Sequence, residues 1–193
     1  MKIVEISPAQ MERRVSRFSK LVPMQQQKPD SLPPEAMEAI TAPKLYPVLS
    51  PKEDNGPWAN PPIEIDEGIA MLIAECQPGE GPPLHAHHRT HEIFTVLKGA
   101  FKIAWGNEGE HEVILGLHDT IAVPMGCHRR FQNVSDEVGL LQAIILCEGG
   151  GDDFSDISYP PETGEMLASK YGPGVLDEMA KIGITFDSET DSA

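Results

Sequence analysis

The most informative stretch of the sequence is residues 79–99, which read GEGPPLHAHHRTHEIFTVLKG. His85 and His87 are two residues apart, and side chains two apart on a strand project from the same face. Glu92 follows after a short loop, and its parity groups it with Phe94 and Val96 on the next strand. Because these apolar residues are expected to face a core, two imidazoles and one carboxylate should converge inside the protein.

Two neutral imidazoles and one carboxylate form a ligand set that suits Fe(II), Mn(II), Ni(II) or Zn(II). Such a set leaves coordination positions open for water, oxygen or a substrate oxygen, as catalytic metal sites do. We therefore predict a mononuclear divalent-metal site whose ligands are His85, His87 and Glu92.

The segments around this stretch are short and strand-like, and Gly, Pro or Asp-rich turns such as Gly106-Asn107-Glu108-Gly109 separate them. The expected strands cover residues 68–75, 84–88, 92–97, 101–105, 113–115, 120–123, 130–133 and 140–146. Many short strands without intervening helices predict an all-β, antiparallel barrel or sandwich.

Residues 79–99 resemble the first motif of the cupin family, G(X)5HXH(X)3-4E(X)6G, whose fixed positions are filled by Gly79, His85, His87, Glu92 and Gly99. The second cupin motif, G(X)5PXG(X)2H(X)3N, is matched at Pro124, Gly126 and Asn133. The resemblance implies an antiparallel jelly-roll β-barrel, which we place at residues 61–150. By analogy with the family, it also implies a homodimer.

The second motif departs from the family pattern at two positions: His118 replaces its glycine, and Arg129 replaces the histidine that is usually the fourth ligand. His128 lies one residue early and should face the opposite way, unless a bulge shifts the strand. Two interpretations of Arg129 remain open. It pairs with Glu92 in a metal-free pocket, or it acts as a catalytic residue that fixes an acidic substrate.

The other two histidines of the stretch, His88 and His91, have a parity opposite to the ligands, which predicts rim or solvent positions.

The ends of the chain have a different composition from the middle. In an N-terminal arm (residues 1–60), Met11, Val15, Phe18 and Leu21 recur at helical spacing, which predicts an amphipathic helix packed on the barrel and ending before Pro23. Tyr46 and Trp58 are candidates to cap the barrel mouth. The C-terminal extension (residues 151–193) should contain helices at 162–170 and 175–181, followed by an acidic tail.

The net charge is −15, with thirty acidic and fifteen basic residues. This charge argues against nucleic acid or an anionic membrane as partner, because both repel acidic proteins. Three cysteines without a CxxC pair, and no signal-like or membrane-spanning stretch, predict a cytoplasmic protein with reduced thiols.

Cupins include oxygenases, isomerases, decarboxylases, lyases and binding proteins, so the resemblance leaves the reaction open. The ligand set is typical of an Fe(II)-dependent dioxygenase acting on a small organic molecule. The alternatives are a metal-dependent isomerase or lyase, and a non-catalytic cupin that binds a small anion through Arg129.

Overall fold

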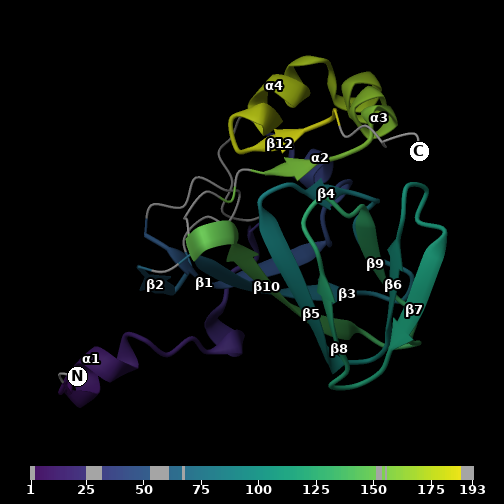
Figure 1. Ribbon diagram of the computed structural model, residues 1–193. Coiled ribbons are helices and arrows are strands. Elements are labelled where there is room, and N and C mark those ends of the chain that lie inside the picture. Colours follow the sequence, from purple (N-terminus) through teal and green to yellow (C-terminus); the bar gives the residue numbers. More distant parts are fainter. Residues whose placement is uncertain are drawn as a thin grey trace.

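Strands with alternating inward and outward side chains build the largest sheet of the computed structural model, which describes residues 3–24, 32–52, 61–66, 68–150, 154 and 156–187. The sheet has the order β2-β1-β3-β10-β5-β8 (Figure 1). Its strands are β1 (Lys44–Pro51), β2 (Ile63–Ile65), β3 (Ile69–Cys76), β5 (Thr90–Lys98), β8 (Thr120–Val123) and β10 (Gly139–Cys147). At its centre, Ala143 of β10 lies opposite Leu72 of β3 and Phe94 of β5, and all three are buried.

A second sheet faces the first and closes the barrel. It has the order β7-β6-β9, from β6 (Phe101–Trp105), β7 (His111–Leu115) and β9 (Arg129–Asn133). Phe131 joins the two layers, since its ring centroid lies 5.4 Å from that of Phe94 and 6.1 Å from that of Phe101. The predicted all-β jelly roll is therefore confirmed, and its core lies between these sheets.

The turn before β8 explains why the second cupin motif begins with glycine. His118 occupies that position with φ 69°, and it is the only non-glycine residue with positive φ in the described part of the chain. Glycine adopts this left-handed conformation without strain, whereas histidine does so at some cost.

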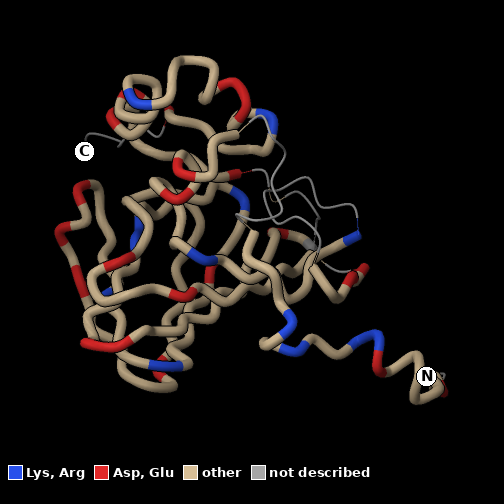
Figure 2. The backbone as a smooth tube through the Cα atoms, turned by 180° about the vertical axis from the view of Figure 1, so that it is seen from behind, with Lys and Arg blue, Asp and Glu red and all other residues tan. Residues whose placement is uncertain are grey.

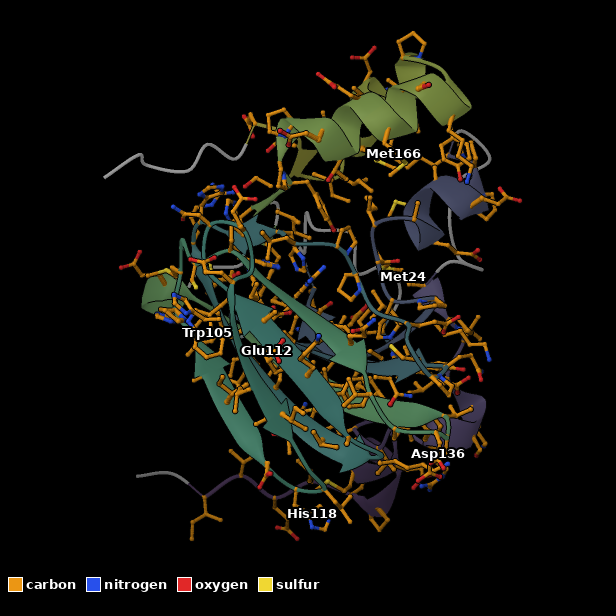
Figure 3. All side chains as sticks on the ribbon, turned by 90° about the vertical axis from the view of Figure 1, so that its right-hand side faces the viewer. Met24, Trp105, Glu112, His118, Asp136 and Met166 are labelled. Atoms are coloured by element: carbon orange, nitrogen blue, oxygen red, sulfur yellow. The ribbon has the colours of Figure 1, made fainter. Side chains whose placement is uncertain are left out.

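The C-terminal extension covers one end of the barrel. A three-stranded sheet, β12-β11-β4, joins β4 (Ala86–His87) of the barrel to β11 (Ile157–Ser158) and β12 (Ile184–Thr185). After η3 (Glu148–Gly150), the helices are α3 (Pro161–Tyr171) and α4 (Gly174–Ala180), close to the predicted ranges. Figure 3 shows these helices, marked by Met166, at one end of the barrel and His118 at the other.

The N-terminal arm has two parts that behave differently. Helix α2 (Pro34–Glu38) is anchored in the core through Ala36 and Met37, and Met24 before it is also fully buried. The leading segment (residues 3–20) contains α1 (Pro8–Glu12) and η1 (Phe18–Lys20), has no buried residue, and extends away from the barrel (Figure 1).

The predicted helix through Leu21 is wrong beyond Glu12. A capping box between Ser7 and Gln10 starts α1 earlier than expected, and Arg13 ends it. So short a helix gains little from backbone hydrogen bonds alone, and none of residues 3–20 is buried against the described part of the barrel. Trp58 and the tail beyond residue 187 lie outside the described residues. No helix in the described ranges is long and apolar enough to cross a membrane.

Candidate metal site

The barrel brings the three predicted ligands together. His85 and His87 come from β4 and its start, and backbone hydrogen bonds in both directions between His85 and Arg129 attach this segment to β9. Glu92 comes from β5, which is held between β8 and β10. All three side chains are buried, and their candidate ligand atoms lie within 4.8 Å of one another. This group could therefore hold a metal ion.

Hydrogen bonds fix the orientation of both imidazoles. His85 Nδ1 lies 2.9 Å from the carbonyl oxygen of Pro83, and His87 Nδ1 lies 3.1 Å from a carboxylate oxygen of Asp156. A carbonyl or carboxylate oxygen can only accept, so Nδ1 is the protonated nitrogen of each ring. The Nε2 lone pair of each ring is thereby left for a ligand, the arrangement that oriented metal-binding histidines show.

The two histidines are neutral in this environment. Burial lowers the pKa of His85 well below its usual range, and the positive charge of Arg129 lowers it further. Burial also lowers the pKa of His87, although the hydrogen bond to Asp156 partly opposes this effect. A neutral imidazole is the form that binds a metal, so no proton has to be removed first.

Arg129 and Glu92 form a buried ion pair. Nε and Nη2 of Arg129 donate to Oε2 of Glu92 at 3.0 and 2.9 Å, and Nη1 donates to the carbonyl oxygen of His85 at 3.4 Å. The predicted ion pair between Arg129 and Glu92 is therefore confirmed. The pair uses one carboxylate oxygen only, and no described residue donates a hydrogen bond to Oε1 of Glu92.

A small cavity lies beside the three ligands, with a volume of about 40 Å³. Its lining includes Ile40, Ala42 and Leu45 from the arm and Ile157 and Tyr159 from the extension. Tyr159 closes the mouth, because its hydroxyl donates to the carbonyl oxygen of Ile40 at 2.7 Å. This volume accommodates an ion with one or two waters, whereas organic ligands occupy sites of roughly 300 Å³ or more.

Asp156 is the functional residue that the sequence did not reveal. Its Oδ1 binds His87, and its Oδ2 accepts from the Arg89 backbone nitrogen at 2.9 Å and from the Thr90 hydroxyl at 3.0 Å. Burial alone would raise the pKa of Asp156, but the hydrogen bond from His87 and the other donors outweigh it and lower the pKa. Asp156 is therefore ionised at neutral pH.

The other sequence predictions have mixed outcomes. His128 is not part of the ligand group, so no bulge brings it into the missing position. His88 is exposed and contacts the Ser158 hydroxyl at 2.6 Å, as a rim residue would.

Tyr46 does not line the cavity; it packs against Phe18 with ring centroids 5.2 Å apart. The mouth is capped instead by residues near Ile40 and by Tyr159.

Comparison with known proteins agrees with the fold. The sequence model of the Cupin domain matches residues 72–145. A comparison with curated proteins gave no match.

Three similar solved structures come from different organisms. A conserved protein with a double-stranded β-helix domain from Klebsiella pneumoniae is 18% identical, with TM-score 0.39, over 44% of this chain and 71% of that chain. The Cnp3 cupin domain of Schizosaccharomyces pombe is 13% identical, with TM-score 0.42, over 54% and 65%. A predicted oxalate decarboxylase from Thermotoga maritima is 19% identical, with TM-score 0.37, over 40% and 65%. The matched part therefore spans just under two thirds of the last two chains.

The jelly-roll topology, the complete first motif and the domain match all identify the same part of the molecule. A cupin-type barrel therefore lies in the middle of the chain, where residues 72–145 match the model of the Cupin domain.

Proposed function

We propose that this protein is a mononuclear metal-dependent enzyme that acts on a small organic molecule, with His85, His87 and Glu92 as ligands of a divalent ion. One observation carries the proposal: two buried imidazoles, each with its Nδ1 atom engaged in a hydrogen bond, and a buried carboxylate have candidate ligand atoms within 4.8 Å of one another. Fe, Mn, Ni and Zn all accept this donor set.

The chemistry of the lining favours a cation over an anion. The Arg129 donors are directed to Glu92 and to the His85 carbonyl, and Arg129 does not line the cavity. The Tyr159 hydroxyl donates elsewhere, and the remaining polar groups at the three ligands are acceptors. These contacts argue against the alternative of a small-anion site built on Arg129.

The buried charges support the same conclusion. Glu92 and Asp156 contribute two negative charges and Arg129 one positive charge, so the site carries −1 before an ion binds. Binding of a divalent cation would change the net charge of the site from −1 to +1. The buried site would then carry a single net charge with or without the ion, and never an uncompensated charge of two. We therefore assign Arg129 to holding Glu92 in place rather than to touching substrate.

An oxygenase-like reaction is favoured over an isomerase or lyase. A bound ion would polarise a substrate oxygen and, in the case of iron, also provide redox chemistry with dioxygen. An isomerase or lyase needs an additional base beside the substrate. Among the described lining residues, Tyr159 is the nearest candidate, but burial raises its pKa and its hydroxyl donates to Ile40. The otherwise apolar lining suits a small uncharged substrate, and the cavity of about 40 Å³ has to widen to admit one.

We place the protein in the cytoplasm. Cys76, Cys127 and Cys147 form no disulfide with one another, and Cys76 and Cys147 are buried, which supports a reducing compartment.

Metal reconstitution followed by an activity screen tests the proposed function. The metal-stripped protein is incubated separately with Fe²⁺, Mn²⁺, Ni²⁺ and Zn²⁺, and bound metal per chain is measured after desalting. Oxygen consumption is then followed with diketones, thiols and phenols. We expect at least one ion to bind and the iron form to consume oxygen. Turnover that persists without oxygen would favour the isomerase or lyase, and failure to bind any of the four ions would refute the proposal.

A further inference from the structure

The cavity beside the candidate ligands is smaller than an organic substrate. A volume of about 40 Å³ holds about one or two waters, so a substrate can enter only if part of the wall moves. Part of the lining comes from strands: Leu72 and Ala74 of β3 and Ala143 of β10 are each paired with strands on both sides. Moving these residues would break the ladders of the sheet. The entrance therefore lies on the side of the arm and the C-terminal extension.

The wall that the extension contributes is attached to the candidate ligands themselves. Ile157 is paired with His87 in the ladder between β11 and β4, and the Asp156 carboxylate is hydrogen-bonded to the His87 imidazole. The ring centroid of Tyr159 lies 5.3 Å from that of His85. Displacing this wall would disturb both histidines, so an entrance here would dismantle the site that it serves.

The wall that the arm contributes is a short strap, residues 34–42, which comprises α2 and the turn that leads into β1. Ile40, Thr41 and Ala42 line the cavity from this turn and belong to no strand. Within the strap, the amides of Ile40 and Thr41 donate to the carbonyl oxygen of Met37 at 3.1 and 2.9 Å. The buried side chains of the strap are all apolar, and apolar packing is not directional. The strap can therefore move without breaking a sheet ladder.

Two tyrosine hydroxyls of the extension hold the strap over the cavity. Tyr159 donates to the carbonyl oxygen of Ile40 at 2.7 Å, and Tyr171 donates to that of Glu35, in α2, at 3.1 Å. The bond from Tyr159 is buried, whereas the bond from Tyr171 is exposed. The net contribution of a single neutral hydrogen bond to stability is small, so such a contact can open and close while the rest of the molecule stays folded.

The surface outside the strap is acidic. Glu35 and Glu38 are exposed on the strap, which contains no basic residue. Figure 2 shows acidic positions in red over the barrel and the C-terminal helices, as expected for a chain whose net charge is −15. An acidic entrance repels anions, which agrees with the small uncharged substrate proposed above.

We propose that the strap is the gate of the metal cavity and that the Tyr159 hydroxyl is its latch. The strap swings outward about the junction between Ala42 and β1, and the hydrogen bond from Tyr159 to Ile40 re-forms when the strap returns. The gate depends on the proposed function, since it serves the same metal site. Tyr159 is a positioning residue, because its hydroxyl acts through the strap. Loss of the latch should raise the rates of entry and exit equally and leave the equilibrium affinity unchanged.

Hydrogen–deuterium exchange of the metal-free full chain tests the gate without requiring a metal. A helix of five residues does not persist away from the body, so opening should expose the amides of the strap. Peptides within residues 34–42 should exchange faster than peptides within β10 or residues 156–159. Tyr159→Phe should accelerate exchange of the strap about fivefold and leave the other two regions unchanged. Tyr46→Phe, which removes a hydroxyl that contacts Glu75, should change none of the three.

Two results of this experiment would overturn the gate. One is equal exchange of the strap and residues 156–159 in the unaltered chain. The other is a Tyr159→Phe variant in which β10 or the extension accelerates as much as the strap, since the hydroxyl would then stabilise the molecule in general.

Metal release gives a second readout. The chain is loaded with Zn²⁺, or with whichever of the four ions it retains, and release of the ion to an excess of chelator is timed. Tyr159→Phe should release and take up the ion about fivefold faster at the same dissociation constant. Faster release with proportionally weaker binding would make Tyr159 a support of the ligands and would overturn the proposal. A chain that retains none of the four ions refutes the proposed function, whereas hydrogen exchange still decides whether the strap opens.

Discussion

Two parts of the chain meet at the candidate metal site, where the barrel supplies the candidate ligands and the C-terminal extension supplies groups around them. The barrel segments β4 and β5 supply every candidate ligand within eight residues of sequence, from His85 to Glu92. The C-terminal extension supplies none, but Asp156 orients His87 from 69 residues away and Tyr159 closes the cavity. The donor set therefore comes from the barrel, whereas the orientation of His87 and the closure beside Tyr159 come from the extension.

The largest effect should follow a change on the barrel side. Glu92→Gln removes the charged partner of Arg129 and leaves the guanidinium buried without a counterion. The free energy of unfolding should fall by about 3–5 kcal/mol in urea denaturation, as it does when buried ion pairs are broken from one side.

The matched control for this change is Glu137→Gln, whose pair with Lys98 is exposed. It should cost about 1 kcal/mol or less. Equal losses in the two variants would mean that the buried pair contributes nothing special to the fold.

A second change asks what Arg129 does to the site. Arg129→His removes a positive charge beside Glu92 and supplies an imidazole at the position of the second-motif histidine. The affinity for Mn²⁺ or Zn²⁺ should increase about tenfold or more in a competition titration, because the repulsion of a cation is lost. Arg130→His, at the neighbouring exposed position, should change nothing. Weaker binding in Arg129→His would show that the guanidinium supports the site rather than opposing it.

In the C-terminal extension, Asp156→Asn tests whether Asp156 orients the His87 imidazole. The variant keeps the size of the side chain but loses the negative charge that accepts from His87, Arg89 and Thr90. Metal affinity should fall about 10- to 100-fold, while metal content at saturation stays the same. Asp177→Asn on the exposed surface of α4 serves as the control. A loss of capacity rather than affinity would make Asp156 a ligand, contrary to its assignment here.

The sequence alone predicts the part of the site that lies in the barrel, but not the part that comes from the C-terminal extension. The facial arrangement of His85, His87 and Glu92 depends on strand parity, which is local and therefore readable. The role of Asp156 depends on the pairing of β11 with β4, a contact between distant segments that no spacing encodes. Asp156 also lies in an acidic stretch with Asp152 and Asp153, so nothing distinguishes it in the sequence.

Arg129 lies between these two cases. Its place in the second motif predicted that it would be near Glu92, but the sequence left open whether it would pair with the carboxylate or face the pocket. The antiparallel bridge between His85 and Arg129 decides the question, because it directs the guanidinium to Glu92 and the His85 carbonyl. The leading segment (residues 3–20) is the opposite case. Its helical spacing is local, but none of its residues is buried against the described part of the barrel, and the spacing alone does not continue the helix beyond Glu12.

The smallest expected effect concerns closure of the cavity. Tyr159→Phe removes the hydroxyl that donates to Ile40 and leaves that buried carbonyl without its partner. Stability should fall by about 1–2 kcal/mol in thermal or urea unfolding, with metal affinity unchanged. Tyr171→Phe loses a more exposed hydrogen bond to Glu35 and should cost less. A reduced metal affinity in Tyr159→Phe would mean that closure and metal binding are coupled.

Metal content per chain tests the central claim most directly. After reconstitution and desalting, the unaltered protein should retain about one divalent ion per chain, and His87→Ala should retain about a tenth of that or less. Both proteins should give the same circular dichroism spectrum, since the barrel core lies apart from this side chain. Equal metal content in the two proteins, whether near one or near zero, would contradict the assignment of the site.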